Sequence, residues 1–363
     1  MTPATPDRWE PAAFKARVDE VLCRFVAQEA DAFTAIDPLL DPVGRCLEAA
    51  VADGKRLRAA FCYWGWRAVG QPDSDALLRA AASMELVHAA AIVHDDLIDD
   101  SPLRHGRPTA QLALRDAVGR HPDPGDTAES AAAAAAGRSL AMLAGDLLMA
   151  LAGQLFTTSG LPAAYLLRAR PLWSVMAREL IAGECLEILR TGACLDTEAS
   201  LKVIRYKTAK YTAEQPLLIG GALAGAGTRL REGLSAYGLP LGEAFQLRDD
   251  LLGLFGAPER TGKASADDVR GQRPTALLAE TWRLAGDEER DVLRTLLERG
   301  ALEAEGLDAV RGMMRRLGAT DRVEDMIRAR VEEALDALHE LPVPAHAARA
   351  LSSLAHAAAV RQF

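Results

Sequence analysis

The sequence predicts an all-α fold, organised as a single large helical bundle. Apolar residues recur at helical spacing along most of the chain, and no segment is dominated by alternating β-branched residues. The sequence also has no tandem repeats and no linker long enough to separate two domains, so its 363 residues are expected to form one domain. We expect residues 1–10 to be a flexible, proline-containing tail and residues 11–363 to form that domain.

Composition and charge narrow the class of protein. Hydrophobic residues make up 49% and charged residues 26% of the chain, as in soluble globular proteins, and the net charge of −9 argues against nucleic-acid binding. The N-terminus lacks the basic-then-apolar order of a signal peptide, and we expect no run to be long enough to span a bilayer. The sequence therefore suggests a cytoplasmic protein without stable membrane insertion. Its five scattered cysteines, with no CxxC pair, fit reduced thiols better than disulfides or a zinc site.

The first hundred residues carry four predicted helices. An amphipathic helix is expected over about residues 14–33, where apolar residues recur every three or four positions. Asp41-Pro42 suits the start of a second helix, over about 41–52. A third helix is expected over about 55–69, and a fourth, with aspartates at its end, over about 75–100.

The rest of the chain is also predicted to be helical, apart from two loops. Residues 119–127 are rich in glycine and proline and residues 260–274 are polar, so both are expected to be loops. The alanine run at 131–136 suits the opening of a helix, since alanine has the highest helix propensity. The helical stretches beyond residue 119 are expected at 131–155, 161–190, 197–226, 229–255, after 274 through 341, and near 346–360.

Four aspartates lie within six residues at the end of the fourth helix: Asp95, Asp96, Asp99 and Asp100. On a helix Asp95 and Asp99 are one turn apart and point the same way, so their charges repel unless a cation joins them. Mg²⁺ is held by one or two carboxylates together with the phosphate oxygens of a substrate. The basic residues that follow suit a phosphate-bearing ligand: Arg104, His105 and Arg107. The pattern predicts a metal-dependent diphosphate site, the alternative being a solvated helix end followed by a loop.

A second acidic pair, Asp249-Asp250, lies deep in an apolar helix, where carboxylates are costly unless they are paired or bound to metal. We expect the two acidic clusters to face each other across a cavity and to share ions. Three cationic stretches accompany them, each of which alone would also fit surface charge. They are Lys55 and Arg58 on one face at the start of the third helix, Lys207 with the Thr208 hydroxyl in a later helix, and Lys263, Arg270 and Arg273 in the loop after the second pair.

The order of these motifs closely resembles that of the trans-type isoprenyl diphosphate synthases (polyprenyl synthetases). The motifs are GKRLR, ELVH, HDDLIDDSPLRHGRPT, AGDLL, KTAKYT, FQLRDDLLGLFG and TGK…DDVRGQRPT, over about residues 53–275. Each motif is weak alone, but seven in the family's order are specific. The resemblance implies the isoprenoid synthase type of helical bundle, with a central cavity, and a homodimer. It also implies Mg²⁺-dependent condensation of isopentenyl diphosphate with an allylic diphosphate (dimethylallyl, geranyl or farnesyl).

The resemblance further implies roles for single residues. Asp95 and Asp99 would bind two Mg²⁺ ions with Asp96 in support, and Asp249 would bind a third. The residues that match positions holding the allylic diphosphate are Arg104, Lys207, Gln246 and Lys263. Those that match positions holding isopentenyl diphosphate are Lys55, Arg58 and His88, with His105 where a second arginine is usual. Thr208 matches a threonine near the reacting carbons.

Three departures from the family's pattern bear on affinity. Because histidine titrates near neutrality, His105 in place of arginine predicts weaker and more pH-dependent binding of isopentenyl diphosphate. Gly253 ends the second acidic motif where many members have aspartate, but the first aspartate of that motif matters most. Arg273 stands where a lysine is usual, which keeps the charge and changes its geometry.

Product length is read from the residues that precede the first acidic cluster. Ala91 and Ala90 lie four and five residues before Asp95, about 6–7.5 Å up the helix axis at 1.5 Å per residue. Short-chain members of the family often have a bulky aromatic residue here, so two alanines suggest a pocket open past fifteen carbons and a twenty-carbon product, geranylgeranyl diphosphate. The expected stop is Leu86, Val87 or a neighbouring residue such as Met149. Alanine is also common throughout this chain, which is the plainer explanation.

Two other functions share part of this pattern. A class I terpene cyclase has a helical fold and a DDxxD motif, but it does not need the cations Lys55 and Arg58 or His88, and its second metal motif is typically of the Asn/Ser/Glu type. A non-catalytic subunit of a heteromeric prenyl synthase is the second alternative, supported by His105 and Gly253. Both acidic motifs are intact, which favours a catalytic chain.

Overall fold

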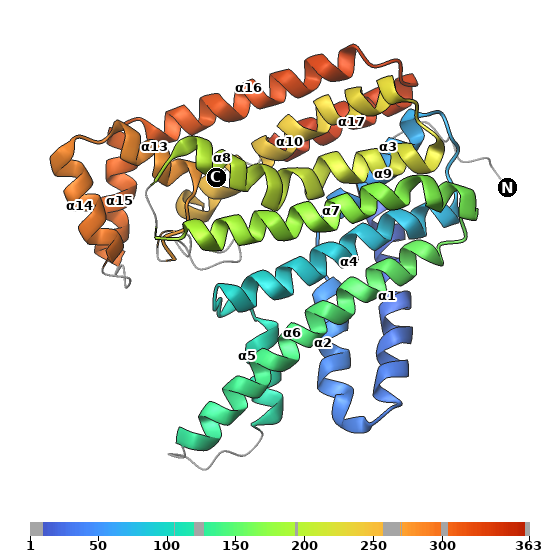
Figure 1. The fold of residues 1–363 in the computed structure, drawn as a ribbon, viewed down its shortest axis with the longest axis horizontal. Coiled ribbons are helices and arrows are strands. Elements are labelled where there is room, and N and C mark those ends of the chain that lie inside the picture. Colours follow the sequence, from blue (N-terminus) through green and yellow to red (C-terminus); the bar gives the residue numbers. More distant parts are fainter. Residues whose placement is uncertain are drawn as a thin grey trace. The chain divides into compact units, whose positions relative to one another are not determined.

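The computed structural model describes residues 10–104, 106–119, 127–192, 195–256, 269, 271–298 and 304–359. Nearly all regular structure in these ranges is helical, which confirms the predicted all-α fold (Figure 1). The chain divides into two compact units. The N-terminal unit takes the chain up to Tyr63 together with Pro72–Leu166, and the C-terminal unit takes Trp64–Gln71 and the chain from Leu167. The expectation of one domain from residue 11 onward stays a prediction.

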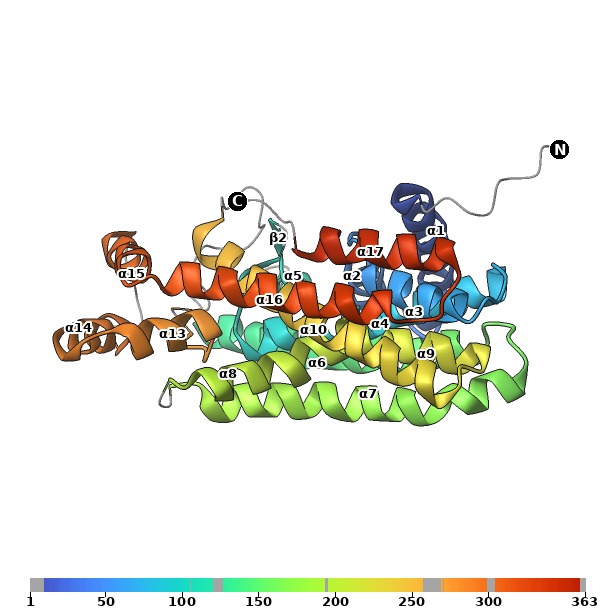
Figure 2. The same ribbon diagram turned by 90° about the horizontal axis from the view of Figure 1, so that it is seen from above.

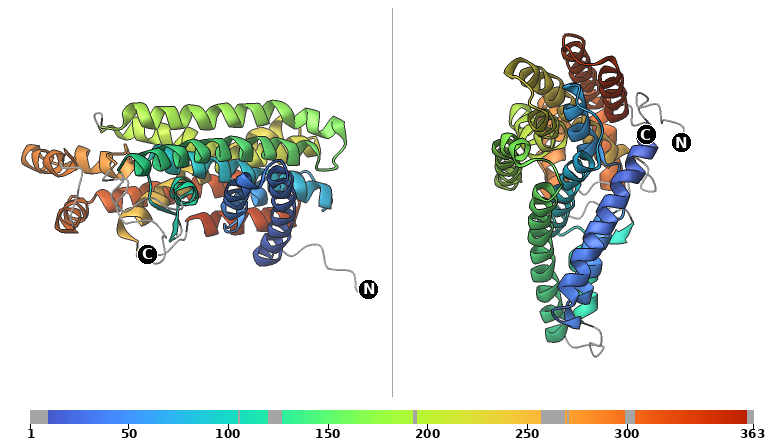
Figure 3. Two further views of the ribbon diagram at one scale, coloured as in Figure 1. Left: turned by 90° about the horizontal axis from the view of Figure 1, so that it is seen from below. Right: turned by 90° about the vertical axis from the view of Figure 1, so that its right-hand side faces the viewer.

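The N-terminal unit is built around α4, Asp75–Ile98. Ser74 caps α4, since its side chain accepts a hydrogen bond from Leu77 N at 3.1 Å. Helix α6 packs along both α4 and α5 (Figure 3), and α1 and α2 pack against each other as a hairpin (Figure 1). The remaining helices of this unit are α1 (Pro11–Thr34), η1 (Pro38–Leu40), α2 (Asp41–Val51), the first half of α3 (Leu57–Ala68), α5 (Ala110–Val118) and α6 (Thr127–Thr157).

A short antiparallel ribbon follows α4 and was not predicted. It pairs β1, Leu103–Arg104, with β2, Arg107–Pro108 (Figure 2). Gly106 takes φ +74° in the turn, a conformation that glycine adopts without steric cost. Two-residue strands are too short to show the alternating pattern that marks a strand in sequence. The ribbon matters because it carries Arg104 back toward the aspartates at the end of α4.

The C-terminal unit is organised around α10, Thr228–Phe255. Helices α16 and α17 run beside α10 (Figure 2), and the Tyr237 hydroxyl donates to Leu351 O at 2.7 Å, which fastens α17. Buried side chains of α10, α13, α15 and α16 form its core. The other helices are α7 (Ala163–Arg190), α8 (Thr197–Val203), η2 (Ile204–Glu214), α9 (Gln215–Ala224), α13 (Ala276–Leu284), α14 (Asp287–Glu298), α15 (Ala304–Arg316), α16 (Ala319–His339) and α17 (Ala345–Ala359).

Two expectations about single elements were wrong. The sequence suggested no run long enough to span a bilayer, whereas α4 and the Ser130–Thr157 part of α6 are long and apolar enough by length and composition. The apolar window of α4 is 72% buried in the protein, as is usual for the core helix of a globular protein, and that of α6 is 44% buried. Helix α5 was missed, because its nine residues give too short a pattern to read with confidence from sequence alone.

Candidate active site

The first acidic cluster closes α4. The Asp99 backbone N donates to Asp95 O at 2.9 Å, so the two residues lie one helical turn apart, as expected. Asp100 then takes φ +51°, which ends the helix. Its side chain accepts a hydrogen bond from Arg138 at 2.9 Å, away from the helix axis. The carboxylates of Asp95 and Asp99 are thus the pair that shares one face of α4.

Arg104 on β1 is bound to the first two aspartates of this cluster. Its Nε donates to Asp96 Oδ1 at 2.9 Å and its Nη2 to Asp95 Oδ2 at 3.1 Å, with a further short contact from Nη2 to Asp96. Asp96 is buried, and Arg104 is largely buried. Burial alone would lower the pKa of Arg104, but the hydrogen bonds and charges of Asp96 and Asp95 outweigh it and raise that pKa. The cluster therefore carries a permanent positive charge beside its negative ones.

The expected cationic face of the third helix is not formed as predicted. Helix α3 begins at Leu57, so Lys55 precedes it and is exposed, and the i, i+3 relation between Lys55 and Arg58 does not hold. The reason is Arg56, which takes φ +56° and whose buried side chain bonds Asp19 Oδ1 at 2.6 Å. Arg58 is buried in the first turn of α3. Arg56 thus has a structural role, and its conformation separates Lys55 from Arg58.

Glu85 is a site residue that sequence reasoning missed. It is buried on α4, three residues before His88, and accepts a hydrogen bond from the Ala59 backbone N at 2.8 Å. A carboxylate at this place satisfies a backbone donor of the first turn of α3. Its position in the ELVH motif was the available signal, since a glutamate among apolar helix residues needs a partner.

His88 is half-buried on α4. Burial lowers its pKa well below the usual value, and the positive charges of Arg58, Arg104 and Arg56 lower it further against the opposing effect of Asp95. The imidazole is therefore neutral at pH 7. It can offer one donor and one acceptor, but no charge.

The two alanines that precede the acidic cluster point to different sides of α4. Ala90 is completely buried and shares its face with Leu86, which is also completely buried. Ala91 is only partly buried and lies on the face of His88 and Asp95, three residues before it and four after it. Ala90 thus lies beside buried Leu86, whereas Ala91 lies beside His88 and Asp95.

The second acidic pair lies in the C-terminal part of α10, which ends at Phe255. Asp250 is buried and accepts a hydrogen bond from Gln246 Nε2 at 2.8 Å, whereas Asp249 is half-buried. The arginine between Gln246 and Asp249 points elsewhere: Arg248 binds both carboxylate oxygens of Glu324 on α16, at 2.5 and 2.7 Å. Gln246, one helical turn before Asp250, thus supplies it with an amide donor.

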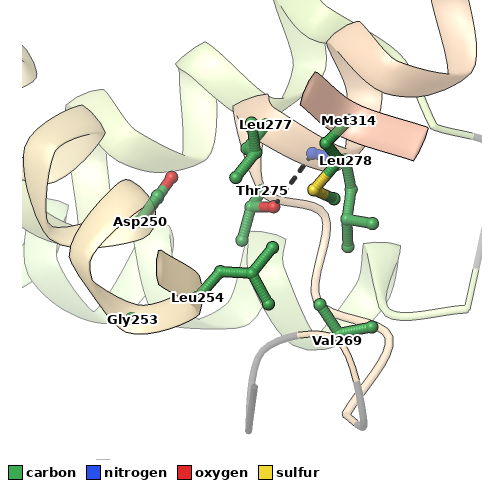
Figure 4. A pocket seen from close by; sticks show the side chains of 8 residues that line it. All are labelled: Asp250, Gly253, Leu254, Val269, Thr275, Leu277, Leu278 and Met314. Carbon is green, nitrogen blue, oxygen red and sulfur yellow. Dashed lines mark hydrogen bonds between the residues drawn. The ribbon is translucent and has the colours of Figure 1, made fainter. Parts of the chain in front are cut away.

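A small cavity adjoins the second pair. Asp250, Gly253 and Leu254 of α10 line it together with Thr275, whose hydroxyl accepts a hydrogen bond from Leu278 N at 3.3 Å (Figure 4). Its volume of about 10 Å³ suits a single water molecule. It is far too small for a prenyl chain, so the substrate does not bind in this cavity.

Lys207 lies in η2, which is a π-helix and thus wider than the α-helix expected there. Its Nζ lies 3.1 Å from Glu184 Oε2 on α7 and makes a short contact with Glu187. These two glutamates were missed, although their i, i+3 spacing places both on one face of α7. One turn on, Lys210 lies 3.0 Å from Glu179. A ladder of opposite charges thus joins η2 to α7.

Glycines on two neighbouring helices make room for the π-helix. A Cβ on Gly183 of α7 would lie 2.1 Å from Lys207 N, and one on Gly242 of α10 would lie 2.5 Å from Ala209 O. Both approaches are possible only without a side chain. The backbone around Lys207 and Thr208 is therefore enclosed between α7 and α10.

The structure brings the predicted residues together in two sets. The N-terminal unit holds Asp95, Asp96, Asp99, Arg104, Arg58 and His88, and the C-terminal unit holds Lys207, Thr208, Gln246 and Asp249. His105, Lys263 and Arg270 lie outside the described residues. That the two acidic clusters face each other stays a prediction. Each set offers hard oxygen ligands beside cations, the combination that binds a metal diphosphate.

Comparison with known proteins decides the family. The family model named polyprenyl synthetase matches residues 41–314. The chain belongs to the polyprenyl synthetase family. It is 34% identical over 317 residues to the (2E,6E)-farnesyl diphosphate synthase of Mycobacterium tuberculosis, covering 85% of this chain and 80% of that protein. To the octaprenyl diphosphate synthase of Escherichia coli it is 30% identical over 309 residues, covering 85% and 86%.

A solved structure agrees with this membership. The crystal structure of the geranylgeranyl pyrophosphate synthase of Corynebacterium glutamicum, complexed with isoprenyl diphosphate and magnesium, is 32% identical. It superposes with a TM-score of 0.89 over 98% of this chain and 100% of that one. This polyprenyl synthetase therefore has the isoprenoid synthase fold, as predicted. It is a trans-prenyltransferase that acts on isoprenoid diphosphates.

Proposed function

We propose that this trans-prenyltransferase condenses isopentenyl diphosphate with an allylic diphosphate (dimethylallyl, geranyl or farnesyl) in Mg²⁺-dependent chain elongation, and that its product is geranylgeranyl diphosphate. The observation that carries the proposal is the end of α4. Asp95 and Asp99 share one face of the helix there, and Arg104 is already bound beside them. The complex of the Corynebacterium glutamicum enzyme with isoprenyl diphosphate and magnesium supports it.

The donor set fits Mg²⁺. Asp95, Asp99 and Asp249 are only partly buried and offer carboxylate oxygens, the ligands that Mg²⁺ prefers, and a metal held by few carboxylates leaves places for phosphate oxygens. When bound, Mg²⁺ neutralises the charge that develops on the departing diphosphate. We infer that Asp95 and Asp99 hold two such ions, that Asp96 keeps Arg104 in place beside them, and that Asp249 holds a third.

The side chains of this chain provide binding and charge. Arg104, Lys207 and Lys263 would hold the allylic diphosphate, and Gln246 would help through an amide. Each contact between unit charges is worth roughly 4 kcal/mol at an effective dielectric near 20, so several together lower the barrier to C–O cleavage substantially. Because Glu184 and Glu187 already hold Lys207, the lysine is oriented before substrate arrives.

The step that forms the new carbon–carbon bond depends more on keeping water away from the carbocation than on catalytic side chains. Cleavage leaves an allylic cation, which the double bond of isopentenyl diphosphate attacks, and the proton then lost goes to the departing diphosphate. Lys55, Arg58, His88 and His105 would hold isopentenyl diphosphate, and Thr208 would lie near the reacting carbons. An apolar, water-free pocket keeps the cation from being quenched.

Product length depends on the side of α4 that the growing tail follows. The tail is apolar, so the side of Ala90 and Leu86 suits it better than the side of His88 and Asp95. A small residue at position 90 leaves that side open to a longer tail, and Met149 on α6, which packs along α4, is a candidate stop. The relatives make farnesyl and octaprenyl products, so their names do not fix the product of this chain.

The assembly we propose is a homodimer in the cytoplasm. The apolar window of α6 is only 44% buried within the chain, and Met142 and Leu143 are about half exposed on it. A second copy packed on this face would remove these side chains from water. Size measurement of the purified protein by light scattering tests this part.

A product assay tests the activity. Purified protein is incubated with labelled isopentenyl diphosphate and each allylic diphosphate, with Mg²⁺ or with chelator, and the dephosphorylated products are sized by chromatography and mass. A Mg²⁺-dependent series that ends at twenty carbons is the expected result. Cyclic hydrocarbon formed from the allylic diphosphate alone would instead identify a terpene cyclase. Failure to consume isopentenyl diphosphate with every primer would indicate a non-catalytic subunit.

Substitution of the two alanines tests the path of the tail. Ala90→Phe is expected to shorten the product to fifteen carbons or fewer, because the ring fills the apolar side of α4. Ala91→Phe is the matched comparison: it should raise KM for the diphosphates by crowding His88 and Asp95, with product length nearly unchanged. If Ala91→Phe shortens the product and Ala90→Phe does not, the tail follows the other side of the helix.

A further inference from the structure

A buried carboxylate on α10 binds two arginines from different elements. Glu243 has only 2% of its surface exposed. Its Oε1 accepts from Arg205 Nε of η2 at 2.7 Å, and its Oε2 accepts from Arg330 Nε of α16 at 2.6 Å. Each oxygen thus has one charge-assisted hydrogen bond, which is the stronger kind. Both bonds lie within the C-terminal unit.

The bond to Arg205 lies next to the functional stretch of the π-helix. Arg205 is two residues before Lys207, and Ala209, one residue after Thr208, touches α10 at Gly242. Gly242 is the neighbour of Glu243 in sequence, so one short segment of α10 holds η2 on both sides of Lys207 and Thr208. The same helix carries Gln246 and Asp249 on its next turns. The register between η2 and α10 therefore sets the spacing between Lys207 and Asp249.

A π-helix needs such support more than an α-helix does. Its hydrogen bonds join residues five apart, and it occurs mainly as single turns, whereas η2 extends over 11 residues. On the side of α7, Gly183 lets the backbone approach Lys207, and Glu184 holds the lysine side chain. On the side of α10, Arg205 gives the first turn of η2 a charge-assisted hydrogen bond to Glu243.

We propose that Glu243 is a positioning residue for the reaction: through Arg205 it fixes the π-helix against α10, so that Lys207 and Thr208 stand at the right distance from Gln246 and Asp249. This inference rests on the proposed function, in which Lys207 holds the allylic diphosphate and Asp249 holds the third Mg²⁺ ion. Arg330 supports the same carboxylate from α16 and also lies 3.8 Å from Glu333 of its own helix. The two arginines therefore separate a positioning effect from a purely structural one.

Three variants test the inference: Glu243→Gln, Arg205→Met and Arg330→Met. Methionine keeps the aliphatic stem of arginine and removes the hydrogen bonds. We expect Glu243→Gln and Arg205→Met to raise KM for the allylic diphosphate and to lower kcat/KM roughly 10- to 100-fold, the effect of a displacement of about 1 Å. KM for isopentenyl diphosphate should stay close to that of the unchanged protein. Arg330→Met should lower Tm and leave both KM values unchanged.

A second readout does not depend on turnover. Isothermal titration with inorganic pyrophosphate and Mg²⁺ should show weaker binding in Arg205→Met than in Arg330→Met, and Arg205→Lys should recover part of the affinity because it keeps the charge. Equal losses in the two methionine variants, in proportion to their Tm, would overturn the inference and leave Glu243 a structural residue. If the unchanged protein does not elongate, the proposed function fails, and the pyrophosphate affinities still decide the role of Glu243.

Discussion

The buried aspartates of the two acidic clusters accept hydrogen bonds from different kinds of side chain. At the end of α4, Asp95 and Asp96 share the guanidinium of Arg104. In the C-terminal part of α10, Asp250 accepts from the neutral amide of Gln246, while Arg248 binds Glu324. A charged donor stabilises a carboxylate more than a neutral one does. Among the contacts described, the buried aspartate of the first cluster thus accepts from a cation and that of the second from a neutral amide.

The largest effects should come from the carboxylates that we expect to bind metal. Asp95→Asn and Asp249→Asn each remove a charged oxygen ligand, and each should lower kcat/KM by at least about 100-fold, as loss of one preorganised electrostatic contact does elsewhere. Initial rates measured over a range of Mg²⁺ concentrations check this. Asp116→Asn, at an exposed carboxylate of α5, is the control and should behave like the unchanged protein.

An unequal outcome would sharpen the comparison. Asp99 remains on the same face of α4 when the Asp95 carboxylate is lost, so excess Mg²⁺ should restore part of the activity of Asp95→Asn. It should restore less for Asp249→Asn, since Asp250 is buried and turned to Gln246. Normal turnover in Asp249→Asn would mean that the second cluster does not hold metal.

The free energy of unfolding should fall more when the charged donor Arg104 is removed than when the amide donor Gln246 is removed. Arg104→Met leaves buried Asp96 without its guanidinium, and breaking such a pair costs about 3 kcal/mol or more. Gln246→Met removes one hydrogen bond to a carboxylate, a loss of about 1.5–3 kcal/mol. Urea unfolding with chelator present measures both losses. Arg138→Met, at an exposed pair with Asp100, should cost less than about 1 kcal/mol.

The sequence predicted the extents of the long helices well, but it predicted less well where a helix begins after a turn. Helical periodicity gave the extents of α1, α4, α10 and α17 to within a few residues, because each buries a long apolar face. The start of α3 was wrong because the left-handed conformation of Arg56 depends on Asp19, 37 residues away. Local patterns cannot show a partner that is distant in sequence. The resemblance to a family supplied most of the proposed site residues.

The site residues that the sequence did not predict are mainly side chains that hold other site residues in place. Glu85, Glu184 and Glu187 bind groups at or beside the expected substrate residues, but as single glutamates on helices they look like surface charge. The π-helix was also missed, because the 11 residues of η2 are too few for their apolar pattern to distinguish a π-helix from an α-helix. Glycines 183 and 242 were the available signal, and they become meaningful only once the neighbouring backbone is known.

Glycines in the two units differ in what an added Cβ would meet. Gly183→Ala would place a Cβ 2.1 Å from Lys207 N, which is backbone and cannot rotate away, so a loss of about 1–3 kcal/mol is expected. In the N-terminal unit, a Cβ on Gly145 would lie 2.3 Å from His94 Nε2, a side chain that can turn aside. Gly145→Ala should therefore cost less. Thermal unfolding measures the difference.

Gly153→Ala is the control for these two substitutions. Gly153 lies in α6 like Gly145, and a Cβ there would meet nothing within 4 Å. Since alanine favours the helix over glycine by up to about 1 kcal/mol, this variant should be as stable as the unchanged protein or more so. A larger loss for Gly145→Ala than for Gly183→Ala would show that the His94 side chain is held more firmly than the π-helix.

The smallest expected effect is a pH dependence of stability that comes from His88, which precedes the first acidic cluster on α4. Burial and three arginines lower the folded-state pKa of His88 well below its unfolded value, near 6.5. The unfolded state therefore binds more protons, so stability is full above the unfolded pKa and falls as pH drops below about 6.5. His88→Gln should flatten the decline of Tm between pH 7 and 5, measured with chelator. His356→Gln, at an exposed histidine, should leave that decline unchanged. If both variants flatten the decline of Tm equally, the pH dependence comes from the net charge of the protein and not from His88.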